Sequence, residues 1–209
     1  MNCKSISIRL AVNFAWRTFR RRYGLFGAIL LTIFGAWVVL EIIVITGQRF
    51  GIVLWAVAHL AFLIFFAGLQ VGFVRICLAI YDGGEPTFAD TFAHLAQGPR
   101  FLTGQLLYLL MVMIGLALLV IPGVYLSARY GLFGFSLAVG EADLAGSFRQ
   151  SAVLSAGARA CLLSILLGLL AFNLLGASLL GLGLLITVPL SLLIMTAVYR
   201  QLSRVLQTH

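Results

Sequence analysis

Three ionisable residues inside long apolar runs are the first candidates for chemistry: Glu41, His59 and Arg129. Ionisable side chains within a membrane are costly and often functional. Each lies six to eight residues from the expected outer end of its run, about 9–12 Å below the outer boundary at about 1.5 Å per residue. Groups at similar depth predict a polar cluster. As a substrate or proton site, it would let Glu41 and His59 exchange protons while Arg129 holds an anion.

The same three residues also fit a purely structural role. Glu41 and Arg129 would then form a buried ion pair, and His59 would donate to a backbone carbonyl or face interfacial water. Arginine can also extend its charged end toward the lipid headgroups. The structural interpretation requires fewer assumptions, because nothing in the sequence places the three runs side by side.

Motifs for catalysis, metal binding or cofactor binding are missing from the sequence. It contains no Ser-His-Asp order, no H-E-x-x-H, no Walker A loop and no zinc spacing such as C-x-x-C. Asp82, Glu85 and Asp90 come close to His94, but helix capping and pairing with basic residues explain these carboxylates better than a metal does. We therefore expect no enzyme, no cofactor and no metal.

The basic residues are distributed on one side of the apolar runs. Of fourteen Lys and Arg residues, only Arg49 falls in a connection on the other side, and Arg129 lies inside a run. Cytoplasmic loops are enriched in this way, so both termini are expected in the cytoplasm with an even number of crossings. The net charge of +8 is dispersed beside the membrane, which favours anionic lipid over nucleic acid as the partner. The expected headgroup contacts are Arg17, Arg20, Arg21, Arg22, Arg100, Arg149 and Arg159.

The composition is that of an integral membrane protein. Apolar residues make up 62% and charged residues 10%, against roughly 45–50% and 25% in soluble domains. Runs of about twenty apolar residues are long enough to cross a bilayer as helices. We predict one all-α domain over 1–209, a bundle of six transmembrane helices with interfacial helices on the cytoplasmic side. The three predicted hairpins cover 23–80, 101–139 and 161–206, and the predicted interfacial amphipathic helices cover 4–22, 86–97 and 143–156.

Local signals predict where these helices turn, begin and bend. Pro122-Gly123 predicts a tight outer turn between a third span at 101–121 and a fourth at 124–139. Asp143 is a plausible N-cap for the helix at 143–156. Pro189 predicts a kink in the last span because it removes one helix hydrogen bond.

Small and polar residues inside the spans predict how the helices pack. Gly68 and Gly72 form a small-x-x-x-small pair, which favours close approach of another helix, within the chain or between subunits. Gln70 and Asn173 are expected to form hydrogen bonds between helices rather than to bind a ligand.

Two stretches carry a resemblance to a known group of proteins. Residues 121–132 read IPGVYLSARYGL, and residues 141–159 read EADLAGSFRQSAVLSAGAR. They resemble a broad group of bacterial polytopic membrane proteins of unknown function, which includes the membrane domain fused to some glycerophosphoryl diester phosphodiesterases. The resemblance implies this membrane architecture in a bacterial inner membrane. It does not imply the phosphodiesterase activity, because the catalytic domain is absent. The matching positions are Pro122, Gly123, Phe148, Arg149, Ser151 and Gly157.

The expected function is that of a non-catalytic inner-membrane protein. It would act through its cytoplasmic interfacial helices, on anionic lipid, on a membrane-protein partner or as a homo-oligomer. The first alternative is a small transporter or channel that uses Glu41, His59 and Arg129. The second alternative is a membrane-embedded enzyme that acts on lipid.

Overall fold

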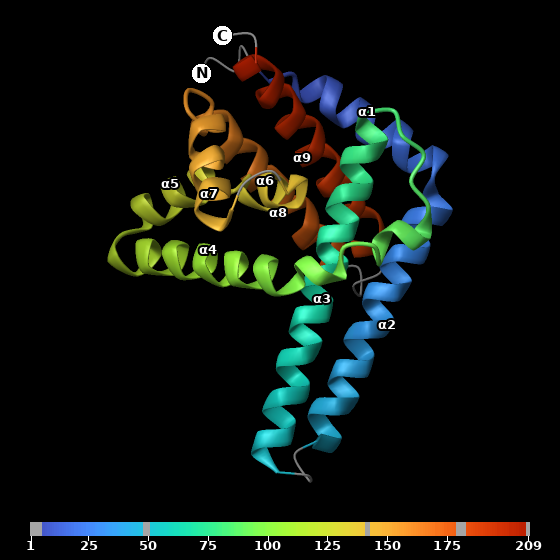
Figure 1. Cartoon of the computed structure of the whole chain (residues 1–209). Helices are drawn as coiled ribbons and strands as arrows, with labels where there is room; N and C mark the ends of the chain where they lie inside the picture. Colours follow the sequence, from blue (N-terminus) through green and yellow to red (C-terminus); the bar gives the residue numbers. More distant parts are fainter. Residues whose placement is uncertain (1–5, 48–50, 141–142, 179–182, 208–209) are drawn as a thin grey trace.

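A computed structural model describes residues 6–47, 51–140, 143–178 and 183–207, and this part of the chain is helical with no β-strand. Two helices, α2 and α3, form a long arm whose far half extends beyond the other helices (Figure 1). The elements are α1 (Ile8–Arg21), α2 (Tyr23–Gly47), α3 (Ile52–Tyr81), η2 (Phe88–Thr91), η3 (Leu95–Gln97), α4 (Gly98–Leu118), α5 (Val120–Tyr130), α6 (Phe133–Val139), α7 (Leu144–Leu154), α8 (Arg159–Ser178) and α9 (Leu184–Gln207).

Within the described residues, five helical segments are long and apolar enough to cross a membrane. Their large apolar side chains are widely exposed, for example 79% for Ile52 at the far end of the arm. Such surfaces are costly in water and suit a hydrocarbon environment. The predicted all-helical, multi-pass character is therefore confirmed. The five segments are Tyr23–Gly47, Ile52–Tyr81, Phe88–Leu118, Arg159–Ser178 and Leu184–Leu206.

The predicted fourth span at 124–139 is not one continuous helix. It is divided between α5 and α6, with Gly131 and Leu132 at the break. Ser151 of α7 compensates, because its Oγ accepts a hydrogen bond from the Leu132 amide at 3.2 Å and donates to the Arg129 carbonyl at 3.2 Å. Ser155 donates to the same carbonyl at 3.1 Å. Irregular backbone is tolerated in this way where protein groups satisfy it, so six unbroken spans are not what the structure contains.

The turn between α4 and α5 lies three residues before the predicted position. Leu119 is extended, with φ −162° and ψ 144°, and α5 begins at Val120. Pro122 therefore falls in the first turn of α5, where its missing N–H breaks no helical hydrogen bond. The two helices approach closely, since a Cβ added to Gly115 would lie 2.8 Å from the Gly123 Cα.

The segment 86–97 is not the continuous α-helix that was predicted. It forms two 3-10 turns, η2 and η3, which run along α3 and pack on the glycine pair. A Cβ on Gly72 would overlap the Thr91 carbonyl, and one on Gly68 would lie 2.9 Å from the Leu95 Cα. The close approach predicted for Gly68 and Gly72 is confirmed, with a 3-10 segment as the neighbour.

The path of this segment sets where α4 begins. Gly98, the first residue of α4, packs against the backbone of Ile64. Ile64 lies 17 residues before Tyr81, which is about 26 Å of helix at about 1.5 Å per residue. Figure 1 shows α4 running across α3 rather than alongside it. The predicted arrangement of three helical hairpins in series is therefore not confirmed.

Polar contacts between helices follow the predicted pattern at two places. The Gln105 amide donates to Gln70 Oε1 at 2.6 Å, joining α4 to α3. The Asn173 amide donates to Ser191 Oγ at 2.8 Å, joining α8 to α9. The predicted N-cap is also confirmed, since Asp143 Oδ1 accepts from the Gly146 amide at 2.9 Å.

The last two helices and the outer turns are described in part. Pro189 lies inside α9, which continues past it to Gln207. The predicted turn at Gly181-Leu182-Gly183 begins outside the described residues, and Arg49 in the predicted outer turn of the first hairpin also lies outside them.

Candidate anion-binding site

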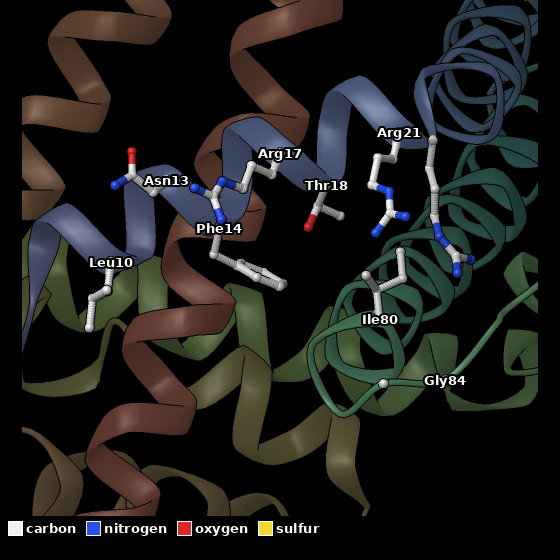
Figure 2. A pocket seen from close by; sticks show the side chains of 10 residues that line it. Leu10, Asn13, Phe14, Arg17, Thr18, Arg21, Ile80 and Gly84 are labelled. Atoms are coloured by element: carbon white, nitrogen blue, oxygen red, sulfur yellow. The ribbon is translucent and has the colours of Figure 1, made fainter.

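A cavity of about 530 Å³ opens between α1 and the end of α3 (Figure 2). Three arginines near the N-terminal end of the chain line it: Arg17, Arg21 and Arg22. We call it the arginine cavity. Its other polar lining groups are Asn13 and Thr18.

The register of α1 brings these side chains together. Asn13, Arg17 and Arg21 recur at intervals of four residues, so they share one row on the helix. Ala11 and Ala15 lie on the opposite side, fully buried where α1 packs on α9. Their small side chains let α1 lie close to α9 and turn the row of polar residues toward the end of α3.

Two of the arginines keep their charges available. Within the described residues, neither Arg17 nor Arg21 forms an ion pair, while Arg22 Nη2 lies 3.7 Å from Glu85 Oε1. The Glu85 side chain is 90% exposed, and an exposed pair of this kind contributes little energy. The cavity therefore carries an excess of positive charge.

Thr18 adds a hydroxyl to the cavity. The residue is only 9% exposed, and Figure 2 shows its hydroxyl pointing away from α1 into the space above Ile80. No hydrogen-bond partner for this hydroxyl occurs among the described residues. A hydroxyl that faces a cavity can form a hydrogen bond with a ligand there.

Two glycines after α3 form one wall of the cavity. Gly83 has φ +88°, a conformation that other residues rarely adopt, and nothing lies within 4 Å of a Cβ built on it. The Gly84 amide donates to the Ala79 carbonyl at 2.8 Å, which ends α3 in a tight turn. The absence of side chains here keeps the cavity open beside the arginines.

The lining predicts what the cavity can bind. Guanidinium groups donate two parallel hydrogen bonds to phosphate or carboxylate oxygens, and a hydroxyl can donate a further one. Phe14 and Ile80 supply an apolar wall beside these donors. A phosphate attached to an apolar body fits this combination better than a free polar anion does. No group of three or more His, Cys, Asp or Glu residues able to hold a metal occurs in the described parts of the chain.

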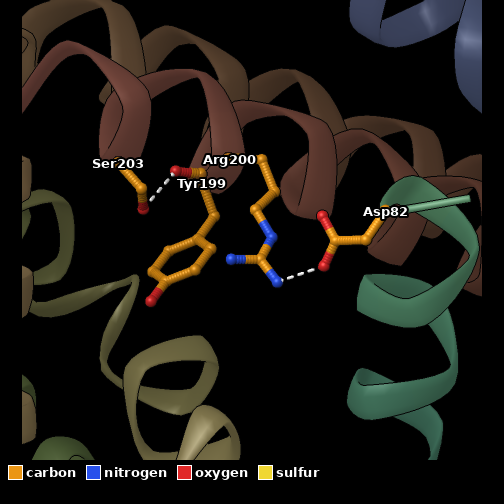
Figure 3. A network of polar contacts seen from close by, with 4 residues as sticks. All are labelled: Asp82, Tyr199, Arg200 and Ser203. Carbon is orange, nitrogen blue, oxygen red and sulfur yellow. Dashed lines mark hydrogen bonds and ion pairs between the residues drawn. The ribbon is translucent and has the colours of Figure 1, made fainter. Parts of the chain in front are cut away.

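A second cavity of about 510 Å³ lies on the other side of the same turn. Its charged groups are paired with protein groups: Arg200 forms an ion pair with Asp82 (Figure 3), and the Thr87 amide donates to Asp90 Oδ2 at 2.6 Å. Arg75 donates to the Ala138 carbonyl at 2.6 Å. The contacts of Arg200 and Arg75 join α3 to α9 and to α6, and the contact of Asp90 caps η2. This cavity is therefore a junction between helices.

The structure separates the three intramembrane residues of the predicted polar cluster. Glu41 and His59 lie in the far half of the α2–α3 arm, whereas Arg129 lies on α5, which packs on α4, α7 and α8. No ion pair joins Glu41 to Arg129 among the described residues. The His59 ring stacks on Trp55 with centroids 5.4 Å apart, and the Arg129 guanidinium lies 5.3 Å from the Tyr130 ring centroid.

The seven arginines predicted to contact headgroups also lie in different parts of the structure. Arg17, Arg21 and Arg22 share the arginine cavity, while Arg20 is exposed on the same helix. Arg100 lies at the start of α4, and Arg149 is exposed on α7. Arg159 is bound within the protein, donating to the Tyr125 hydroxyl at 2.7 Å with its guanidinium 5.1 Å from that ring.

Sequence reasoning missed Thr18 and the wall formed by Ile80, Gly83 and Gly84. A Gly-Gly pair after a long apolar run does signal the end of a helix. That this end lies beside α1 depends on tertiary packing, which no local pattern carries.

The whole chain was also compared with known proteins. No family model, no curated protein and no solved structure matches it. The functional assignment therefore rests on the arginine cavity and the helices that form it.

Proposed function

We propose that this chain is a non-catalytic, multi-pass protein of the bacterial inner membrane that binds anionic phospholipid headgroups in the arginine cavity. The observation that carries the proposal is the convergence of Arg17, Arg21 and the Thr18 hydroxyl on one cavity, where none of the three has a partner among the described residues. Arginine clusters beside membrane helices attract anionic lipid at about 1 kcal/mol per basic residue.

Contacts between helix ends support a common side for both termini. The Ser7 amide donates to Gln201 Oε1 at 2.8 Å, which ties the start of α1 to the end of α9. The ion pair between Arg200 and Asp82 ties the end of α9 to the end of α3. Helix ends in contact lie on one side of a membrane, so the number of crossings is even. The excess of basic residues on this side favours the cytoplasm.

The exposed surface of α1 supports an interfacial position. Ile8, Val12 and Trp16 recur every four residues, and each is at least 44% exposed. This apolar row can enter the boundary between headgroups and acyl chains. A partner protein or a second copy could use the same row, and lipid is favoured because α1 also carries basic residues.

The test compares two double variants that remove equal charge. The full-length protein is purified in mild detergent, and the retained phosphatidylglycerol is counted by native mass spectrometry. Arg17→Gln with Arg21→Gln should weaken retention about 25-fold, because each arginine contributes about 1 kcal/mol, or about fivefold. The control is Arg20→Gln with Arg149→Gln, two exposed arginines outside the cavity. Equal losses in the two double variants would show diffuse attraction and contradict the proposal.

A further inference from the structure

We infer that the arginine cavity selects a lipid headgroup with two phosphodiesters joined by a short polyol over a headgroup with one. This inference rests on the proposed function and specifies the class of lipid. It follows from the charge of the cavity, from the positions of the charges along it and from its size.

The charge of the cavity calls for a doubly charged ligand. Arg17, Arg21 and Arg22 together carry three positive charges, and the Glu85 carboxylate lies against Arg22. The arginines and Glu85 thus sum to +2. A single phosphodiester would neutralise half of this charge, and two phosphodiesters would neutralise all of it.

The charges are separated along the cavity rather than gathered at one point. Figure 2 shows the Arg17 guanidinium near Phe14 and the Arg21 guanidinium further along α1, with the Thr18 hydroxyl between them. Two phosphates in this orientation would each meet one guanidinium. The linking polyol would then lie next to the Thr18 hydroxyl, which can form a hydrogen bond with it.

The volume of the cavity allows such a ligand. About 530 Å³ lies within the range of about 300–1,000 Å³ typical of small-molecule sites. The apolar wall of Phe14 and Ile80 borders the cavity where acyl chains would leave it. A free bisphosphate would gain nothing from that wall, so the proposed ligand is a lipid.

The experiment matches total charge between lipids. Full-length protein in nanodiscs of neutral phosphatidylcholine receives either diphosphatidylglycerol or phosphatidylglycerol at twice its mole fraction, and bound lipid is counted by native mass spectrometry. At equal charge we expect about fivefold greater retention of diphosphatidylglycerol, from engagement of a second arginine. Equal retention would overturn the inference and leave the proposed function standing. Retention of neither lipid above phosphatidylcholine would overturn the proposed function itself.

A single variant tests the two separated charges. Arg17→Gln should bring the ratio of diphosphatidylglycerol retention to phosphatidylglycerol retention close to one, while phosphatidylglycerol remains bound through Arg21. The matched control Arg20→Gln, on the same helix outside the cavity, should leave the preference unchanged. An unchanged preference in Arg17→Gln would overturn the inference. Retention of phosphatidic acid equal to that of diphosphatidylglycerol would also overturn it, because the single phosphate of phosphatidic acid does not need a second arginine. Inorganic phosphate in excess should leave the bound lipid in place, and full displacement by it would also overturn the inference.

Discussion

At the residue scale, Ser151 replaces backbone hydrogen bonds that are missing where α5 ends and α6 begins. It is fully buried, and its hydroxyl contacts both the Leu132 amide and the Arg129 carbonyl. We predict that Ser151→Ala lowers the free energy of unfolding by about 1–3 kcal/mol, because the Leu132 amide is left without its partner. Ser164→Ala is the control, since its exposed hydroxyl bonds only the Ala160 carbonyl of its own helix. Thermal unfolding in detergent measures both, and equal shifts would contradict this role.

The separation of Glu41 from Arg129 also gives a prediction at this scale. Glu41→Gln and Arg129→Gln should change stability additively, within about 0.3–0.5 kcal/mol, because the two residues lie on helices without a shared contact network. Thermal unfolding of the two single variants and the double variant tests this. Recovery of stability in the double variant would instead indicate the buried ion pair that the sequence also allows.

Some polar residues were predictable because a local rule applies to them. Asp143 as an N-cap and the interhelical bonds of Gln70 and Asn173 follow from short-range chemistry, and the structure confirms them. The arginines were predictable as a class because basic residues flank membrane spans. Which of the arginines share a cavity was not predictable, because that depends on how α1 is oriented about its own axis where it packs on α9.

At the element scale, the glycine pair of α3 admits the backbone of η2 and η3. Gly72→Ala should destabilise the protein by about 1–3 kcal/mol, because the new methyl group would overlap the Thr91 carbonyl. Gly35→Ala on α2 is the matched control, with nothing within 4 Å of the added Cβ. It should be neutral or stabilising by up to about 1 kcal/mol, through helix propensity. Unfolding midpoints in the same detergent decide the outcome, and destabilisation of equal size would contradict this packing.

Helices with a long apolar pattern were predictable, and those shaped by tertiary contacts were not. α2, α3, α8 and α9 follow from uninterrupted apolar runs. The break between α5 and α6 requires the serines of α7, which lie some twenty residues further along the chain. The 3-10 path of 88–97 likewise requires the surface of α3, which local sequence does not reveal.

At the scale of the whole molecule, the contacts between helix ends give a prediction about topology. Reporter fusions after His209 and within 82–97 should both report the cytoplasm, and a fusion at Gln48 should report the outside. The physical reason is that the ends of α3 and α9 are joined by the ion pair between Asp82 and Arg200. A periplasmic signal after His209 would contradict an even number of crossings.

The class of the molecule was predictable from its composition, and its arrangement was not. The apolar content and the one-sided distribution of basic residues are properties of the whole chain, so an error in predicting one helix does not change the predicted class. The angle of α4 across α3 depends instead on a few close contacts, such as Gly98 against Ile64.

The packing of α1 on α9 has a consequence for the order of biogenesis. The ribosome makes α1 before α9, so Ala11 and Ala15 can pack on α9 only once that later helix is in place. Until then, α1 has its basic row and its small-residue face both exposed beside the translocation machinery. The orientation that turns the arginines of α1 toward the end of α3 is therefore fixed only after α9 has been made, so a nascent chain that stops before Leu184 would display the arginines without a fixed arginine cavity.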